Sequence, residues 1–150
     1  MVIYFGADHR GFKLKENLKS FLRNQGYEVA DLGAASLEEG DDYPDFAAAV
    51  AGKVSAEPER DRGILICDSG VGMDIVANKF LGVRAALAVS ADQIYGARHD
   101  DNVNILCLAA DFISEEDAQK IVGVFVSTPF SGEERYKRRL NKISQIENED

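Results

Sequence analysis

The chain has 150 residues, 45% hydrophobic and 29% charged, values typical of one globular domain with its own hydrophobic core. Its net charge of -9 argues against nucleic acid or an anionic membrane as a partner, because both bind basic surfaces. No apolar run approaches the roughly 18 residues of a membrane span, and the N-terminus lacks the basic region of a signal peptide. We therefore expect one cytoplasmic domain over residues 1–150.

Short apolar runs alternate with helical patterns along the chain. The first helical pattern places Leu14, Leu18 and Leu22 on one stripe, and Gly26 follows at the position of a C-cap glycine. In chain order the predicted elements are a strand at Val2–Gly6, a helix at Lys13–Gln25, a strand at Tyr27–Leu32, a helix at Asp45–Ser55, a strand at Gly63–Cys67, a helix at Val71–Lys79, a strand at Arg84–Val89, a helix at Ala91–His99, a strand at Asn104–Leu108, a helix at Ser114–Val126 and a charged, exposed helix at Gly132–Glu149.

This alternation of strands and helices predicts a parallel sheet with helices on both faces. With right-handed crossovers, the fold is a three-layer α/β/α Rossmann-like domain that has five parallel strands and a C-terminal helix. Ligands of such sheets bind beyond the carboxyl ends of the strands. The functional residues are therefore expected just after the strands.

Polar residues do gather after the predicted strands. Asp8 and His9 follow the first strand, and Cys67 and a polar turn come at the end of the third strand. The segment Arg98–Asn102 follows the fourth strand and its helix, and it contains His99, the second of the two histidines. We therefore expect both histidines to lie near the functional site.

The turn Asp68–Gly72 is suited to a close approach to a ligand. Its two glycines let the backbone come near a bound group, and free N–H groups at the start of the next helix favour an anion. Cys67 precedes this turn, and a helix N-terminus is expected to lower the pKa of its thiol and suit it to act as a nucleophile or base. The other cysteine, Cys107, is expected to be a small buried hydrophobe, and the cysteine spacing matches no zinc pattern.

An ordered series of motifs resembles a known family. The segments are Asp8-His9-x-Gly11, Phe12-x-Leu14-Lys15, Asp42-Tyr43-Pro44-Asp45, Gly63-Ile64-Leu65-Ile66-Cys67-x-Ser69-Gly70-Val71-Gly72-Met73, Ala77-Asn78-Lys79, Gly82-Val83-Arg84-Ala85, Ser127-Thr128-Pro129-Phe130 and the basic stretch Arg135–Arg139. The series is similar to the type B ribose-5-phosphate isomerases and their galactose-6-phosphate isomerase relatives. The order holds over nearly the whole chain, which makes the set far more specific than any single motif.

The resemblance implies a homodimer or tetramer whose active sites are shared between subunits and bind a small sugar phosphate. It implies a metal-independent proton transfer between C1 and C2 through an enediolate, with no cofactor. By motif, Cys67 is the implied base and Ser69 a second catalytic residue. The implied substrate-binding residues are Asp68, Gly70, Val71 and Gly72 for the enediolate oxygens, Asp8, His9 and Tyr43 for the sugar, and Arg135 and Arg139 for the phosphate.

The segment that opens the sugar ring departs from the family. The family's ring-opening histidine lies four residues before Asn104, where this chain has Asp100, and His99 is one residue earlier. On a helix, one residue is a rotation of about 100°, so His99 is expected to point elsewhere. Both residues stay candidates for the catalytic acid. Asp101 stands at the family's following asparagine and is expected to contact the substrate.

The phosphate-binding positions also depart from the family. Asp111 stands where the family commonly has an arginine, and Asp68 replaces a glycine. A unit charge about 4 Å away is worth on the order of 4 kcal/mol at an effective dielectric near 20, so an acid facing the phosphate weakens binding. Two explanations stay open. Either the sugar carries its phosphate elsewhere or lacks one, or neighbouring bases compensate, namely Arg10, Arg84 and Arg98.

The sequence therefore predicts an isomerase that interconverts ribose 5-phosphate and ribulose 5-phosphate, or a closely related sugar phosphate. Two alternatives remain: an isomerase of another aldose, such as a hexose phosphate or a free sugar, and a catalytically impaired sugar-phosphate-binding homologue. Cys67 argues against the second alternative, because a protein that only binds needs no base. A nucleotide-binding domain is disfavoured, since the chain has neither a G-x-G-x-x-G nor a P-loop lysine pattern.

Overall fold

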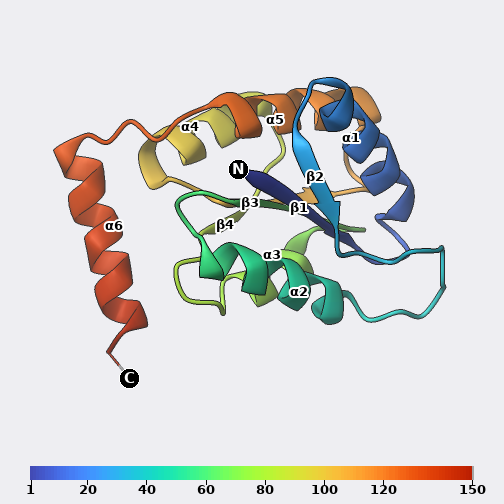
Figure 1. The fold of residues 1–150 in the computed structure, drawn as a ribbon, viewed down its shortest axis with the longest axis horizontal. Helices are drawn as coiled ribbons and strands as arrows, with labels where there is room; N and C mark the ends of the chain where they lie inside the picture. Colours follow the sequence, from blue (N-terminus) through green and yellow to red (C-terminus); the bar gives the residue numbers. More distant parts are fainter. Residues whose placement is uncertain (150) are drawn as a thin grey trace.

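The sheet of this protein is built from β1 (Val2–Ala7), β2 (Glu28–Asp31), β3 (Arg62–Cys67), β4 (Ala85–Leu87) and β5 (Ile105–Ala109). The computed structural model describes residues 1–149. All neighbouring strands pair in parallel, in the order β2-β1-β3-β5-β4 (Figure 1). The chain leaves β1 toward β2 on one side and later adds β3 on the other, so the switch point of the sheet lies between β1 and β3.

Six helices pack around this sheet or beside it: α1 (Phe12–Asn24), α2 (Tyr43–Ala56), α3 (Val71–Ala77), α4 (Ala91–Asp101), α5 (Glu115–Ser127) and α6 (Glu134–Glu147). Helices α1, α4 and α5 cover one face, and α2 and α3 cover the other (Figure 1). The predicted three-layer α/β/α fold with five parallel strands and a C-terminal helix is confirmed.

Element ends differ from the prediction for local reasons. Helix α2 begins two residues early, at Tyr43, because Pro44 fits the first helical turn, where its missing N–H costs nothing. Strand β4 is shorter than predicted, since the flanking N–H groups bond to side chains instead: that of Arg84 to Asn104 at 2.8 Å and that of Val89 to a glutamine at 2.8 Å. Helix α4 runs two residues further than predicted, to the end of the Arg98–Asp101 segment.

The hydrophobic core lies on both faces of the sheet. Fully buried side chains of β1, β3 and β5 point alternately toward the two helix layers, as the period of a strand requires. Cys107 belongs to the layer beneath α2 and α3 and is completely buried, as predicted. Gly26 ends α1 in the left-handed region, with φ of 86°, which also agrees with its predicted role.

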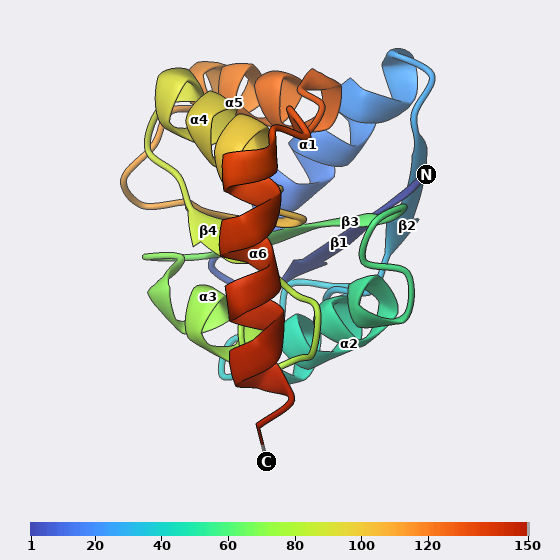
Figure 2. The same cartoon turned by 90° about the vertical axis from the view of Figure 1, so that its left-hand side faces the viewer.

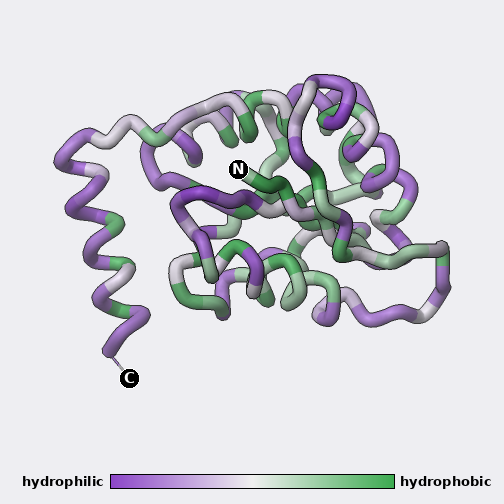
Figure 3. The backbone as a smooth tube through the Cα atoms, viewed as in Figure 1, coloured by the Kyte–Doolittle hydropathy of each residue, from purple (hydrophilic) through white to green (hydrophobic). Residues whose placement is uncertain are grey.

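Helix α6 lies at the end of the sheet opposite the loop of residues 32–42 (Figure 1). Turned by 90°, the molecule shows α6 crossing that end from the α4–α5 layer toward α2 and α3 (Figure 2). The helix is largely hydrophilic (Figure 3), and Tyr136 is its only buried residue among those described. Its last turn is held by Glu147, which accepts the N–H of Gly82 at 3.2 Å. Within residues 1–149, no helix has the length and apolar character needed to cross a membrane.

Candidate active site

Cys67 ends β3, a central strand, and its side chain is at the carboxyl end of the sheet with 3% of its surface exposed. Its Sγ accepts the N–H of Gly70 at 3.1 Å. Gly70 has φ of 75°, and a Cβ there would lie 2.5 Å from the Leu87 side chain, so the turn requires glycine. The sequence therefore folds this turn around the thiol.

The environment of Cys67 corrects one expectation from the sequence. Burial raises the pKa of the thiol, and the N–H groups of Gly70 and Met73 only partly oppose it. The carboxylates of Asp8 and Asp68 raise the pKa further. The prediction of a lowered pKa is wrong for this protomer, because desolvation outweighs the effect of the helix N-terminus.

The turn after Cys67 offers hydrogen-bond donors. The first N–H groups of α3 have no acceptor within the helix, and that of Met73 is directed at the Cys67 thiol. The Val71 N–H donates to Ser69 Oγ over a long distance of 3.4 Å, so the serine hydroxyl lies beside the N–H groups of Val71 and Gly72. Such a group of donors suits oxygens that gain negative charge.

Tyr43 reaches this turn from α2. A Cβ added to Gly72 would lie 2.6 Å from the ring of Tyr43, so the ring packs directly on the glycine. The structure thus brings Tyr43, Cys67 and the turn together, although Tyr43 precedes them by more than twenty residues of sequence.

Asp8 and His9 follow β1, the neighbour of β3. Asp8 is 6% exposed, and its Oδ1 accepts the N–H groups of Arg10 at 3.0 Å and Gly11 at 3.1 Å. Burial raises the pKa of Asp8, although these two hydrogen bonds oppose the shift. The residue therefore places a carboxylate of raised pKa beside Cys67, at the switch point of the sheet.

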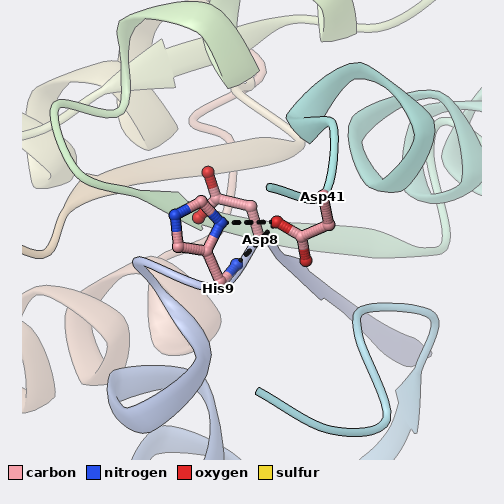
Figure 4. Close-up of side chains that lie close together, drawn as sticks. All are labelled: Asp8, His9 and Asp41. Atoms are coloured by element: carbon pink, nitrogen blue, oxygen red, sulfur yellow. Dashed lines mark hydrogen bonds and ion pairs between the residues drawn. The ribbon is translucent and has the colours of Figure 1, made fainter. Parts of the chain in front are cut away.

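His9 is held by Asp41, a residue that the sequence analysis missed. Asp41 Oδ1 is 2.6 Å from Nδ1 of His9 and also accepts the backbone N–H of His9 at 3.0 Å (Figure 4). This pair raises the pKa of His9, chiefly through the side-chain hydrogen bond. An acid two residues before Tyr43 was the available signal, but spacing alone does not show which loop residue reaches a histidine 32 positions away.

A metal ion is one possible ligand of this cluster. One ligand atom from each of Asp8, His9 and Asp41 lies within 4.8 Å of the other two. The internal hydrogen bonds of Asp8 Oδ1 and His9 Nδ1 already account for the cluster. We name Asp8, His9, Asp41 and Tyr43, with Cys67 and the turn Asp68–Gly72, the carboxyl-end site.

Arg10 lies at the rim of this site between the two unexpected acids. Its guanidinium is 3.9 Å from the Asp68 carboxylate and 3.7 Å from that of Asp111. Arg84 and Arg98 do not take part, because they are bound at the other end of the sheet, where Arg84 donates to Asn102 and the buried Arg98 to Thr128. Of the three bases that were proposed as compensation, Arg10 alone is positioned for it.

A second group of predicted residues surrounds Tyr136 where α4 meets α6. His99 Nδ1 is 2.7 Å from Asp100, and the His99 ring stacks on Tyr95 at 5.6 Å between centroids and meets Tyr136 edge-on at 6.1 Å. Arg135 and Arg139 lie over the Tyr136 ring, at 4.5 and 5.6 Å. We name His99, Asp100, Asp101, Arg135, Tyr136 and Arg139 the α4–α6 cluster.

The carboxyl-end site and the α4–α6 cluster lie at opposite ends of the sheet. Helix α4 starts beyond the carboxyl end of β4 and runs back, so His99 and Asp100 in its last turn reach the amino ends of the strands. The separation is roughly 15–20 Å, the length of a five- or six-residue strand. The expectation that both histidines gather after the strands is wrong within one protomer, because a helix that follows a strand returns to the strand's beginning.

Comparisons with known proteins place this chain in the class of sugar isomerases. The chain is 43% identical over 147 residues, 98% of its length and 96% of the relative's, to a probable ribose-5-phosphate isomerase B of Mycoplasma genitalium.

Crystal structures agree with this relationship. The Mycoplasma genitalium ribose-5-phosphate isomerase B with bound ribulose-5-phosphate matches with a TM-score of 0.96 and 42% identity, over 99% of this chain and 97% of that one. The ribose 5-phosphate isomerase of Thermotoga maritima matches with a TM-score of 0.89 and 44% identity, over 96% and 97%. The family model described as Ribose/Galactose Isomerase covers residues 3–143, and the chain belongs to this family.

Proposed function

We propose that this protein is an aldose–ketose isomerase that interconverts ribose 5-phosphate and ribulose 5-phosphate. One observation carries the proposal: the protein of Mycoplasma genitalium whose structure holds ribulose-5-phosphate has the same fold, with a TM-score of 0.96 over 99% of this chain. The carboxyl-end site supports it, because a thiol, buried carboxylates and free N–H groups are the parts that a proton transfer beside a carbonyl needs.

Cys67 is the proposed base. Its thiolate removes the proton from C2 of the open-chain aldose, the C–H electrons form the double bond between C1 and C2, and the electrons of the C1 carbonyl bond move to O1. A proton then passes from O2 to O1, the carbonyl forms at C2, and the electrons of the C1–C2 double bond take the proton back from the thiol at C1. This gives the ketose and restores the thiolate. The position of Sγ, beside the Gly70 N–H and at the end of a central strand, supports this role. No metal or other cofactor is needed for the transfer.

The turn Asp68–Gly72 is proposed to bind the enediolate. The oxygens of the enediolate carry the charge that develops in the transition state. Donors near them are the N–H groups of Val71 and Gly72 and the hydroxyl of Ser69. Preorganised donors of this kind act without reorganisation at the moment of reaction. Asp8, His9 and Tyr43 line the sugar beside this turn.

A homodimer is proposed to complete the site with the α4–α6 cluster of a second copy. The two groups of site residues are a strand length apart in one protomer, whereas a substrate must meet both the base and the arginines that bind phosphate. Apolar side chains are exposed along the side of the sheet where β4 is the edge: Val71 at 48%, Ile75 at 55%, Val89 at 73% and Tyr95 at 53%. Such a surface suits an isologous contact between two copies.

In this dimer, the α4–α6 cluster contributes charged groups to its partner. Arg135 and Arg139 are proposed to bind the phosphate, since a guanidinium fork contacts two phosphate oxygens at once. His99 and Asp100 pack against the same tyrosine, Tyr136, and they are proposed to contact the sugar together with Asp101, the next residue of α4. The placement of the two arginines over one tyrosine ring holds them as a unit.

We further propose that residues 1–150 form a single sugar-phosphate isomerase domain and that it works in the cytoplasm. One sheet and its two helix layers account for all elements except α6. The small, highly charged substrate belongs to the aqueous compartment in which phosphorylated sugars are made and consumed.

The test is turnover of the purified protein with ribose 5-phosphate, followed as formation of the ketose, with Cys67→Ala as the matched variant. We expect turnover by the unmodified protein and a loss of about 100- to 10,000-fold in the variant, the usual contribution of a general base. Circular dichroism checks that the variant folds. Near-normal turnover by Cys67→Ala would contradict the role of the thiol.

A second candidate function, isomerisation of another aldose, is favoured by Asp68, Asp100 and Asp111, which add acid near a site for an anion. A folded protein that leaves ribose 5-phosphate unchanged but converts a hexose phosphate or a free aldose would establish this alternative. Binding of sugar phosphates without turnover of any of them would favour the catalytically impaired homologue.

A further inference from the structure

His9 is fixed so that one ring nitrogen is left for a substrate. Asp41 Oδ1 contacts both Nδ1 and the backbone N–H of His9, at 2.6 and 3.0 Å, so both the ring and its backbone are tied to one carboxylate oxygen. Figure 4 shows the second ring nitrogen, Nε2, on the side away from Asp41. Because the carboxylate accepts a hydrogen bond from the Nδ1–H, any proton that His9 gives to a substrate leaves from Nε2.

The charges around His9 favour its protonated form. The hydrogen bond that His9 donates to Asp41 is the largest cause of the raised pKa of His9; burial acts against it. The charges of Asp41 and Asp8 raise this pKa further, and Arg10 lowers it. Arg10 is itself shared with Asp68 of the turn after β3, and with Asp111 after β5, which reduces its effect on the imidazole. An imidazolium at neutral pH is a proton donor.

Asp100 stands at the family's position for the ring-opening acid, but it is not a proton donor like His9. The hydrogen bond from His99 lowers the pKa of Asp100, and a hydrogen bond with Tyr136 acts in the same direction, although burial opposes both. An ionised carboxylate only accepts protons. His99 has its Nδ1 occupied by Asp100, and at the other end of the sheet its ring stacks on Tyr95 and meets Tyr136 edge-on.

We propose that His9 is the acid that opens the sugar ring, and that Asp41 is its positioning residue. This inference rests on the proposed function. In the step, the bond between C1 and the ring oxygen breaks, its electron pair goes to the ring oxygen, and that oxygen takes the proton from His9 Nε2. The C1 hydroxyl loses its proton to water and becomes the aldehyde, and His9 regains a proton from solvent. Cys67 then acts on the open chain from the same protomer.

The test measures how the rate of ketose formation depends on enzyme concentration, because this dependence reports on ring opening alone. Without its acid, the enzyme depends on open-chain aldose that forms spontaneously in solution. The rate of ketose formation from ribose 5-phosphate by His9→Gln is therefore expected to reach a plateau as enzyme is added. The rate of the unmodified enzyme, and that of the histidine-matched variant His99→Asn, is expected to stay proportional to enzyme concentration.

The reverse reaction provides the internal control. Ribulose 5-phosphate cannot form a five-membered ring, since its C5 oxygen carries the phosphate, so its conversion needs no ring opening. We expect His9→Gln to lose much less activity with ribulose 5-phosphate than with ribose 5-phosphate. A forward rate of His9→Gln that stays proportional to enzyme, or a plateau in His99→Asn instead, overturns the inference. Failure of the unmodified enzyme to convert either substrate would refute the proposed function itself.

Asp41→Asn tests the positioning role separately and spares the imidazole. Forward activity depends on protonated His9 and falls as pH rises through its pKa. Since Asp41 raises this pKa, Asn at position 41 is expected to move the fall to lower pH. The pH profile of the reverse reaction should lack this shift. Identical forward profiles for the variant and the unmodified enzyme would contradict the role of Asp41.

Discussion

The two ends of the sheet each hold an aspartate–histidine pair, and the two pairs differ in how they are built. At the carboxyl end, His9 and Asp41 are 2.6 Å apart and come from segments 32 residues apart in the sequence. In the α4–α6 cluster, His99 and Asp100 are 2.7 Å apart and are direct neighbours on one helix. The aspartate is 13% exposed in the first pair and 40% in the second.

Under the proposed function, this difference supports a division of roles between the two ends. The carboxyl-end pair is tied to the backbone beside Cys67, so it suits chemistry that needs a fixed ring. The α4–α6 pair is more exposed and lies beside two half-exposed arginines, so it suits capture of a charged substrate group. Under the proposed function, neither end holds both the base and the arginines for the phosphate, which is the reason to expect that two copies combine.

The largest effect is expected from a substitution in the α4–α6 cluster that weakens phosphate binding and leaves the carboxyl-end site unchanged. Arg139→Ala should raise KM for ribose 5-phosphate about 10- to 100-fold, since a charge-assisted hydrogen bond is worth about 1.5–3 kcal/mol. The value of kcat should change less, because Cys67 and its turn are untouched. The matched control is Arg138→Ala, one residue earlier on α6 and outside the cluster. Equal effects of the two variants would remove Arg139 from the phosphate site.

A smaller effect is expected at the rim of the carboxyl-end site. Arg10→Ala leaves Asp68 and Asp111 without their shared cation and should raise KM about 2- to 5-fold, the range for exposed ion pairs. Adding Asp111→Asn to this variant should recover most of the loss, because it removes one of the two repelling charges. Steady-state kinetics of the three proteins checks this. A KM that the second substitution leaves unchanged would mean that Asp111 does not face the substrate.

Fold and site were predictable from the sequence to different degrees. The alternation of strands and helices indicated the layers, and Gly26 and Pro44 act through local geometry that the sequence displays. The lengths of β4 and α4 depend on side chains that capture N–H groups, as Asn104 does, and such contacts are not visible before the fold is known.

The site shows the same limit. The turn after Cys67 is local and was predicted, but the pKa of Cys67 depends on burial by distant segments. Asp41 and Arg10 act through contacts across loops, and Tyr136 acts by packing between α4 and α6. Motif order predicted His99 and Arg135 as site residues without showing that they lie at the other end of the sheet.

The smallest expected effect concerns pH. The charge of Asp68 raises the pKa of Cys67, so Asp68→Asn should lower that pKa. Since the thiolate is the active form, kcat/KM rises with pH through the pKa of Cys67, and the variant should show this rise at a pH lower by a fraction of a unit. Asp45→Asn, an acid of α2 outside the site, is the control. A rise at higher pH in Asp68→Asn would contradict the electrostatic account.

Whether the two ends combine across two copies is tested most directly by mixing two variants. The assay uses ribose 5-phosphate far below the KM of Arg139→Ala, where both variants have little activity. Cys67→Ala damages only the carboxyl-end site, and Arg139→Ala only the α4–α6 cluster. When their subunits are unfolded together and reassembled, each mixed dimer regains one intact site of two, and random pairing restores about a quarter of the unmodified activity. Native mass spectrometry confirms that mixed dimers form. If they form and activity stays at the level of the separate variants, each site is contained in one copy and the account is wrong.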